Sequence, residues 1–410
     1  MRVAVFAPLR RPPLRRLVVA QFFSELGDGV VTVALPLYVY GRSGSALATA
    51  LTFAVQLLAG AVLGFVGGVL ADGFDRQRIL VLSYIGRGGL LVAAFTAGPL
   101  WLAVGCGVLA RAVGQLDNPA FDSMVPEHAG PNDLQQVLAL RRFVQGVSLL
   151  VGPSVGALAV ELIGARAALL VPAVSFGVAC ACLATARELD VSLTRRREHH
   201  ADHTVGQRLM SMREGVSILV RTPVVRRYVG YMAASAMAVA VVLASAVVWF
   251  EERLAVSGSW YGVSMALYGI GTTIGLAWAG GRSWHVALPK LLVGVAPVYA
   301  AANLVGVVAF EPWLLGVGWF VWGIAYGPEI VIGELLVVRS IPEVLRGRAL
   351  AAYAVIALLG SAAGYGLAGP LLETIGPRAT IAWMSAALLV LGAVWLVPSS
   401  VALDNVARAH

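Results

Sequence analysis

The sequence predicts a polytopic α-helical membrane protein, and three observations support this fold class. Of its 410 residues, 59% are hydrophobic and only 13% are charged, and the mean hydropathy is +0.82. A soluble globular protein has about 25% charged residues, so the composition excludes an ordinary soluble enzyme. The apolar residues form long unbroken runs that lack the alternation of barrel strands, and lipid admits only helices or closed barrels.

Twelve of these runs are long enough to cross a bilayer, which takes roughly 20 residues each. In chain order they cover residues 17–40, 46–70, 79–98, 100–119, 143–160, 167–186, 228–250, 259–281, 288–309, 313–338, 349–372 and 379–398. The first run follows a cluster of arginines and exceeds the apolar length of a cleaved signal peptide, so we expect it to remain as a span.

The basic residues predict the topology. Most of the 30 Lys and Arg fall in segments that are cytoplasmic if the N-terminus is cytoplasmic, whereas Arg42, Arg166, Arg253 and Arg378 fall on the other side. This excess predicts a multi-pass protein with both termini in the cytoplasm. It also explains the net charge of +8, so we expect no nucleic-acid partner. Arginine supplies 29 of the 30 basic residues, and alanine, glycine and valine dominate. This composition suggests a GC-rich bacterial genome and so the inner (plasma) membrane as the location.

The two halves of the sequence match at an offset of about 211–216 residues. The matches include Val125-Pro126-Glu127 with Ile341-Pro342-Glu343, and Glu161-Leu-Ile-Gly-Ala-Arg with Glu373-Thr-Ile-Gly-Pro-Arg. We therefore expect an N-terminal six-helix bundle over residues 1–186 and a C-terminal one over 228–410, related by a pseudo-two-fold axis. A cytoplasmic linker with an amphipathic helix is predicted over 187–227.

Metal or cofactor chemistry is not expected. His199, His200 and His203 in the linker could hold a metal, but adjacent histidines point apart on a helix and no cysteine or carboxylate cluster completes the set. The three cysteines lie within apolar runs, as core residues do.

The loop after the second run carries an acid followed by basic residues, which can bridge helix ends by ion pairs or form a solvated turn. Its residues are Gly68, Asp72, Asp75, Arg76 and Arg78. Together with the twelve spans, the repeat and the linker, this loop resembles the major facilitator superfamily over essentially the whole chain. The resemblance implies the major facilitator fold and a gating role for these five residues. Asp75 beside Arg76 is similar to the drug- and siderophore-exporter branch, although Gly73 departs from the usual basic residue.

The fifth run contains Gly152, Pro153 and Gly156. A proline removes one helix hydrogen bond and permits a bend, while glycines at this spacing are equally typical of close helix packing. The segment is similar, in part, to the signature of exporters in the same superfamily.

Ionisable residues within spans are the main functional candidates, because each costs about 2.5–3.5 kcal/mol at the membrane centre. Glu25, Asp28 and Arg111 lie at a similar depth, and the resemblance places their helices around a central cavity. Two carboxylates on one helix face oppose each other's ionisation, so the sequence predicts a proton-coupling group, with a static buried ion pair as the alternative. Arg87 is interpreted as a packing or snorkelling residue.

One face of the tenth run carries Trp319, Trp322, Tyr326 and Glu329 at spacings of three and four. This face would suit an aromatic or cationic lipophilic guest, and an aromatic packing stripe is the alternative. We interpret these four residues as lining a substrate cavity.

The sequence contains no phosphate-binding loop, zinc-protease motif or serine-hydrolase motif, so we expect no enzyme. The predicted function is that of a secondary active exporter, a proton antiporter that expels a lipophilic or amphiphilic small molecule by alternating access. The alternatives are an uptake facilitator or lysophospholipid flippase on the same fold, and a receptor or scaffold that does not transport. The expected partners are the substrate, protons and membrane lipid, and we expect a monomer without cofactors.

Overall fold

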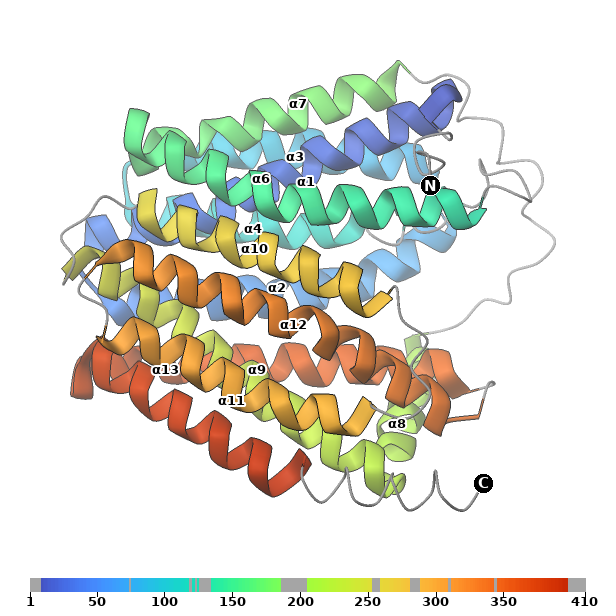
Figure 1. Cartoon of the computed structure of the whole chain (residues 1–410). Helices are drawn as coiled ribbons and strands as arrows, with labels where there is room; N and C mark the ends of the chain where they lie inside the picture. Colours follow the sequence, from blue (N-terminus) through green and yellow to red (C-terminus); the bar gives the residue numbers. More distant parts are fainter. Residues whose placement is uncertain are drawn as a thin grey trace. The chain divides into compact units, whose positions relative to one another are not determined.

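The computed structural model describes ten stretches of the chain, and all the regular secondary structure within them is helical (Figure 1). These are residues 9–73, 75–117, 120–121, 124, 134–185, 205–252, 259–280, 288–308, 311–342 and 345–396. The predicted gating residues Gly68 and Asp72 belong to a helix, but their side chains lie outside the described part. So do the linker histidines His199, His200 and His203.

Most helices follow the predicted spans closely, whereas α6 extends beyond the predicted run 143–160 at both ends and α13 covers the predicted run 349–372 and most of the run 379–398. Their bounds are α1 Pro12–Ser43, α2 Ala46–Gly73, α3 Arg76–Thr96, α4 Leu100–Val113, η2 Gly114–Leu116, α6 Leu134–Ala168, α7 Leu170–Ala184, α8 Val205–Arg221, α9 Pro223–Glu252, α10 Ser259–Gly280, α11 Leu288–Val308, α12 Pro312–Ser340, α13 Arg346–Leu391 and η5 Gly392–Leu396. Eight of the described helices are long and apolar enough to span a membrane, and the shorter apolar ones cover Leu100–Leu116 and Leu170–Ala184. The predicted all-helical membrane class is therefore confirmed.

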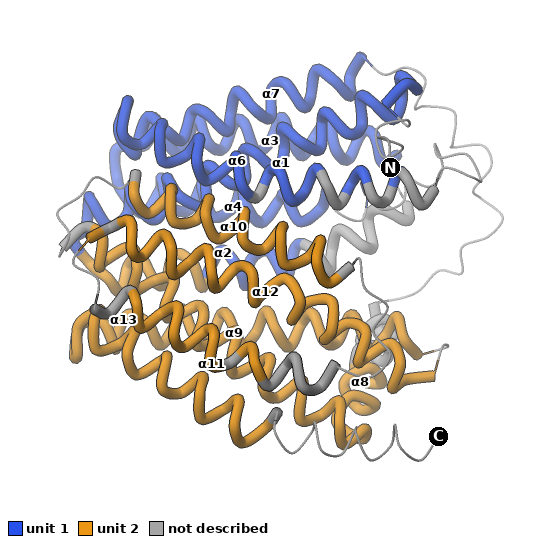
Figure 2. The backbone as a smooth tube through the Cα atoms, viewed as in Figure 1, with its two compact units in different colours: residues 1–44, 55–202 blue, residues 45–54, 203–410 orange. Residues whose placement is uncertain are grey.

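The chain forms two compact units (Figure 2). Unit 1 contains residues 1–44 and 55–202, and unit 2 contains residues 45–54 and 203–410. In unit 1, α1 packs against α6 and α7, and α3 packs against α4 and α7. In unit 2, α10 packs against α12 and α9 packs against α13. The bundle limits expected from the sequence stay a prediction.

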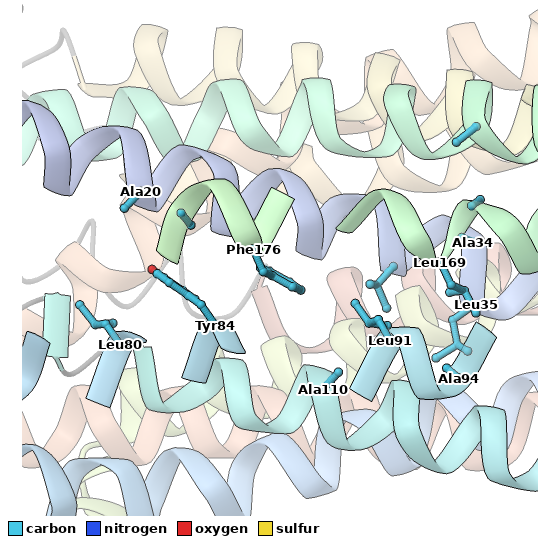
Figure 3. Close-up of a cluster of buried hydrophobic side chains, with 14 of the residues drawn as sticks. Ala20, Ala34, Leu35, Leu80, Tyr84, Leu91, Ala94, Ala110, Leu169 and Phe176 are labelled. Carbon is cyan, nitrogen blue, oxygen red and sulfur yellow. The ribbon is translucent and has the colours of Figure 1, made fainter. Parts of the chain in front are cut away.

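The core of unit 1 lies where α1, α3, α4 and α7 meet. Figure 3 shows Leu80, Tyr84 and Leu91 of α3 beside Phe176 of α7. The rings of Tyr84 and Phe176 are stacked with their centroids 6.4 Å apart. Apolar packing of this kind holds α3 and α7 in place and so fixes the helix positions from which the polar side chains of unit 1 project.

The sequence repeat is also a repeat of backbone geometry. Two long helices are broken by a glycine with positive φ: Gly164 in α6, with φ 82° and ψ 155°, and Gly376 in α13, with φ 76° and ψ 166°. These angles are essentially restricted to glycine. Both glycines belong to the repeated Glu-x-Ile-Gly-x-Arg segment, so the repeat preserves a chain reversal that requires this residue type.

Candidate functional site

A buried arginine joins two acids in unit 1. The guanidinium of Arg87, on α3, donates from Nη2 to Asp28 Oδ1 at 2.5 Å and from Nη1 to Asp117 Oδ2 at 2.7 Å. Asp28 comes from α1, and Asp117 follows η2. Nη1 also donates to the hydroxyl of Ser24 at 3.1 Å. The Arg87 side chain is 1% exposed, and its guanidinium carbon lies 3.9 Å from the centre of the Phe176 ring.

Of the two interpretations of Arg87, snorkelling is wrong because the guanidinium is buried and paired, whereas its contact with the Phe176 ring agrees with packing. The position of Arg87 along its span does not show whether the side chain faces lipid or the protein interior. That direction depends on how α3 is rotated about its axis relative to α1. One signal was present in the sequence: an intramembrane arginine requires an acid, and Asp117 lies at the end of the adjacent span. Arg87 and Asp117 are the functional candidates that the sequence reasoning missed.

Of the three predicted coupling residues, Asp28 contacts this arginine directly. Arg111, on α4, reaches Asp28 Oδ1 at 3.3 Å and also donates to the Asp28 main-chain oxygen at 3.3 Å. The side chains of this pair are 30% and 28% exposed, so it is far more accessible than the pair formed by Arg87. Glu25 accepts a hydrogen bond of 2.8 Å from Gln21, one turn earlier on α1. Asp28 therefore lies between a sealed arginine and an accessible one.

A pocket of about 210 Å³ opens beside this group. It is lined by Gln21, Ser24, Glu25, Asp28, Gly114, Gln115, Asp117 and Phe121. Three of these residues are carboxylic acids, and most of the others offer polar atoms. A pocket of this size admits several water molecules or a small charged group, so solvent or a cationic group can reach the acids.

Unit 2 holds its buried acid differently. Glu329, on α12, is 5% exposed and accepts a short hydrogen bond at Oε2 from the hydroxyl of Tyr299, on α11. Tyr228, on α9, donates to the main-chain oxygen of Glu329 at 3.4 Å. In the described part of the chain, the side chain of Glu329 forms no ion pair. The hydrogen-bond partner of this carboxyl is a neutral phenol, the hydroxyl of Tyr299.

The predicted aromatic face of α12 lies in a continuous cluster of rings. Trp322 contacts Trp319, Tyr268 and Tyr299 with ring centroids 6.0, 5.2 and 6.1 Å apart, and Tyr326 lies 5.9 Å from Tyr268. Trp319 and Trp322 are only 2% and 1% exposed, whereas Tyr326 is half-buried. In this conformation the two indoles are closed off, and Tyr326 is the accessible member.

At the predicted gate, the described contacts of Asp75 are with residues at the start of α3, directly after it in the sequence. Its carboxylate caps α3 by accepting from the main-chain N–H groups of Gln77 and Arg78, and it forms an ion pair of 3.2 Å with Arg78. Asp75 thus satisfies the exposed N–H groups at the start of a helix. The gating role of Asp75, Arg76 and Arg78 stays a prediction.

The glycines of the fifth span form a close contact between α1 and α6. A Cβ built at Gly152 would lie 2.8 Å from the Cα of Gly29, and one at Gly156 would lie 3.0 Å from the Cα of Val30. The backbone leaves helical angles at Gly164 and not at Pro153. The contacts match the packing alternative, while the bend at Pro153 stays a prediction.

Known proteins share this architecture along nearly their whole length. The sequence profile of the Major Facilitator Superfamily matches residues 17–296. The multidrug efflux pump Tap of Mycobacterium tuberculosis (strain ATCC 25618 / H37Rv) is 26% identical over 400 residues, with 94% of this chain and 93% of Tap covered. The enterobactin exporter EntS of Shigella boydii serotype 18 is 26% identical over 404 residues, covering 94% of this chain and 91% of EntS.

Solved structures agree at the level of the fold. A crystal structure of the peptide transporter POT with sulfate has a TM-score of 0.73 at 16% identity, covering 96% of this chain and 95% of POT. A mutant of the nucleoside transporter NupG has a TM-score of 0.75 at 11% identity, covering 93% of this chain and 98% of NupG. The predicted major facilitator fold is confirmed, and the chain belongs to the Major Facilitator Superfamily of membrane transporters, which are not enzymes.

Proposed function

We propose that this transporter is a proton antiporter that exports a lipophilic or amphiphilic small molecule by alternating access. The observation that carries the proposal is the pocket of unit 1, which Asp28 and Glu25 line, together with the contact between Asp28 and the accessible Arg111. Buried acids lower the stability of a membrane protein, so they are typically found where function requires them, in ion pathways and proton relays. The efflux names of Tap and EntS support export as the direction.

In the proposed cycle, a proton on Asp28 or Glu25 weakens the attraction of Arg111 for this group. The 3.3 Å contact between Arg111 and Asp28 is the exchangeable one, because both side chains are partly exposed. Losing it changes how firmly α4 is tied to α1, so proton binding favours one arrangement of the helices over another. Release of the proton on the cytoplasmic side restores the ion pair.

The substrate contacts are proposed to come from unit 2. Trp319, Trp322, Tyr326 and Glu329 carry the aromatic faces and the acid, with Tyr326 as the first contact because it is half-buried. Aromatic faces attract cations and stack on planar guests. The two indoles become available when the cluster opens. The proposed gate of the cycle is the segment with Gly68, Asp72, Asp75, Arg76 and Arg78. The proposed site of a bend in α6 is the segment with Gly152, Pro153 and Gly156.

The proposal is tested in proteoliposomes that contain the full chain and the dye ethidium, with a pH gradient imposed across the membrane. Wild-type protein is expected to move the dye against the proton flow. The rate of this transport is expected to be at least about tenfold lower in Asp28→Asn. The matched control is Glu161→Gln, because Glu161 is an exposed acid on α6 of the same unit. Normal gradient-driven transport by Asp28→Asn would exclude coupling through this group. Dye movement with the proton flow would indicate uptake.

A further inference from the structure

The helices of the two halves share one register, which identifies equivalent residues. Helix α3 begins at Arg76 and α11 at Leu288, while α4 begins at Leu100 and α12 at Pro312. In both cases the separation is 212 residues, and it also separates the reversal glycines Gly164 and Gly376. At this spacing Arg87 corresponds to Tyr299, and Asp117 corresponds to Glu329.

These equivalent residues form equivalent contacts inside their own units. Arg87 donates to Asp117 Oδ2, and Tyr299 donates to Glu329 Oε2. Each acid is 5% exposed. The repeat therefore preserves a buried acid held by a donor on the preceding span, although the donor is a cation in unit 1 and a neutral phenol in unit 2.

The positive charge around Asp117 only partly compensates its carboxylate, which favours binding of a proton. Arg87 is shared with Asp28, so Asp117 receives only part of its charge. Asp28 has a second arginine in Arg111, whereas Asp117 has no second cation among the described residues. The other oxygen of Asp117, Oδ1, is buried and has no hydrogen-bond partner in the described part of the chain. This side chain also lines the pocket of unit 1, through which a proton can arrive.

Protonation of Glu329 is favoured for a different reason. A buried carboxylate without a cation is costly unless hydrogen bonds or protonation remove the charge. The hydroxyl of Tyr299, which donates to the side chain of Glu329, is neutral. A protonated Glu329 can accept this bond at Oε2 and carry its proton on the other oxygen, which leaves no net charge in the cluster.

We propose that Asp117 and Glu329 are a further pair of proton-binding acids, one in each half, at positions that the internal repeat makes equivalent. This deepens the proposed antiport, on which its role in transport rests, because it adds proton-binding acids to Asp28 and Glu25. Arg87 is then a positioning residue: when Asp117 is protonated, the guanidinium is left to Asp28.

Titratable and charged groups from several helices face the two acids. Around Asp117 they are Glu25 and Asp28 of α1, Tyr84 and Arg87 of α3, Arg111 of α4 and, beside Glu25, Arg141 of α6. The sequence of α7 carries no acidic or basic residue. Around Glu329 they are Tyr228 and Tyr231 of α9, Tyr268 of α10, Tyr299 of α11, Tyr326 of α12 and Tyr353 of α13, with Glu334 of α12 beside Tyr353.

The experiment counts protons on the purified full-length protein in detergent, with an indicator dye in weak buffer. The pH is lowered from about 9 to about 5.5, a range in which exposed carboxylates stay ionised. Asp117→Asn and Glu329→Gln are each expected to take up about one proton fewer than wild type, and the double variant about two fewer. Glu161→Gln and Glu373→Gln are the matched controls, because these exposed acids are also equivalent in the repeat and should change nothing.

A second measurement needs no variant. Dicyclohexylcarbodiimide reacts with protonated buried carboxyls, and mass spectrometry of the wild-type protein is expected to find adducts on Asp117 and Glu329 near pH 5.5 and none near pH 9. Unchanged proton uptake in a variant, together with no adduct on that acid, would overturn the assignment of that acid. Loss of gradient-driven transport with intact uptake would count against the antiport and leave this inference standing.

Discussion

The main chains of Gly29 and Gly152 touch. A Cβ built at Gly29 would lie 2.7 Å from the Cα of Gly152, and a Cβ built at Gly152 would lie 2.8 Å from the Cα of Gly29. No side chain fits between α1 and α6 at this level. The contact brings α6 against the helix that carries Glu25 and Asp28, and so supports the position of the acids in unit 1.

Gly152→Ala is expected to destabilise the protein by about 1–3 kcal/mol, because one helix has to shift to admit the methyl group. The matched control is Gly177→Ala in α7, where nothing lies within 4 Å of the added atom. Since alanine favours a helix by about 1 kcal/mol over glycine, the control should melt at the same temperature or higher. Thermal unfolding in detergent compares the two, and equal melting of Gly152→Ala and wild type would contradict the contact.

Replacement of the reversal glycines Gly164 and Gly376 by alanine should destabilise both halves to a similar extent. Gly164→Ala and Gly376→Ala are each expected to lose about 1–3 kcal/mol of stability, because their positive φ angles strain any residue with a Cβ. Open space surrounds both positions, so the loss measures backbone strain alone. Gly366→Ala, at a helical position of α13 with equally open surroundings, is the control. A variant of either reversal glycine as stable as this control would be inconsistent with the observed angles.

The two arginines of unit 1 should differ in their effect on stability. Arg87→Gln leaves two acids without their sealed partner and is expected to cost about 3–5 kcal/mol. Arg111→Gln should cost less, because its pair with Asp28 is partly exposed and screened by water. Combining Arg87→Gln with Asp117→Asn should recover part of the loss. Thermal melting compares wild type, the two single variants and the double variant. A larger loss of stability in Arg111→Gln than in Arg87→Gln would contradict the assignment of Arg87 as the buried structural partner.

The attachment of α8 to α13 should depend on packing more than on charge. Glu214 forms an exposed ion pair with Arg348, whereas a Cβ at the neighbouring Gly215 would collide with the Arg348 main chain and reach Ala352 Cβ at 3.1 Å. Glu214→Ala is expected to change stability by less than about 1 kcal/mol. Gly215→Val should release α8. Limited proteolysis measures the release as faster cleavage, and equal cleavage rates would refute this ranking.

Tyr326 should contribute to substrate affinity if the aromatic cluster of unit 2 contacts substrate. Tyr326→Ala is expected to raise the ethidium concentration for half-maximal transport about tenfold, which corresponds to about 1.4 kcal/mol. The control is Trp313→Ala at the start of the same helix, where the indole is 53% exposed. An equal shift in both variants would assign the effect to the stability of α12, and no shift in either would exclude Tyr326 from the contact.

Hydropathy predicts the spans well because lipid imposes a length on each apolar run, and α3, α10 and α11 lie within a few residues of their predicted limits. The pairing of Arg87 could not be predicted in the same way. It depends on the rotation of α3 about its axis, which is set by contacts such as that of Tyr84 with Phe176. The burial of Trp319 and Trp322 depends likewise on rings from α10 and α11 that are distant in sequence.

The difference between the two halves has an electrical consequence. In unit 1, Asp28 and Asp117 face Arg87 and Arg111, so two negative charges balance two positive ones. In unit 2, the ionised form of Glu329 has no such balance among the described residues. A membrane voltage acts on net charge, with about 2.3 kcal/mol for one charge moved across 100 mV. Voltage should therefore act on the ionised form of Glu329, and on the group of unit 1 only in the state in which a proton on Asp117 removes this balance.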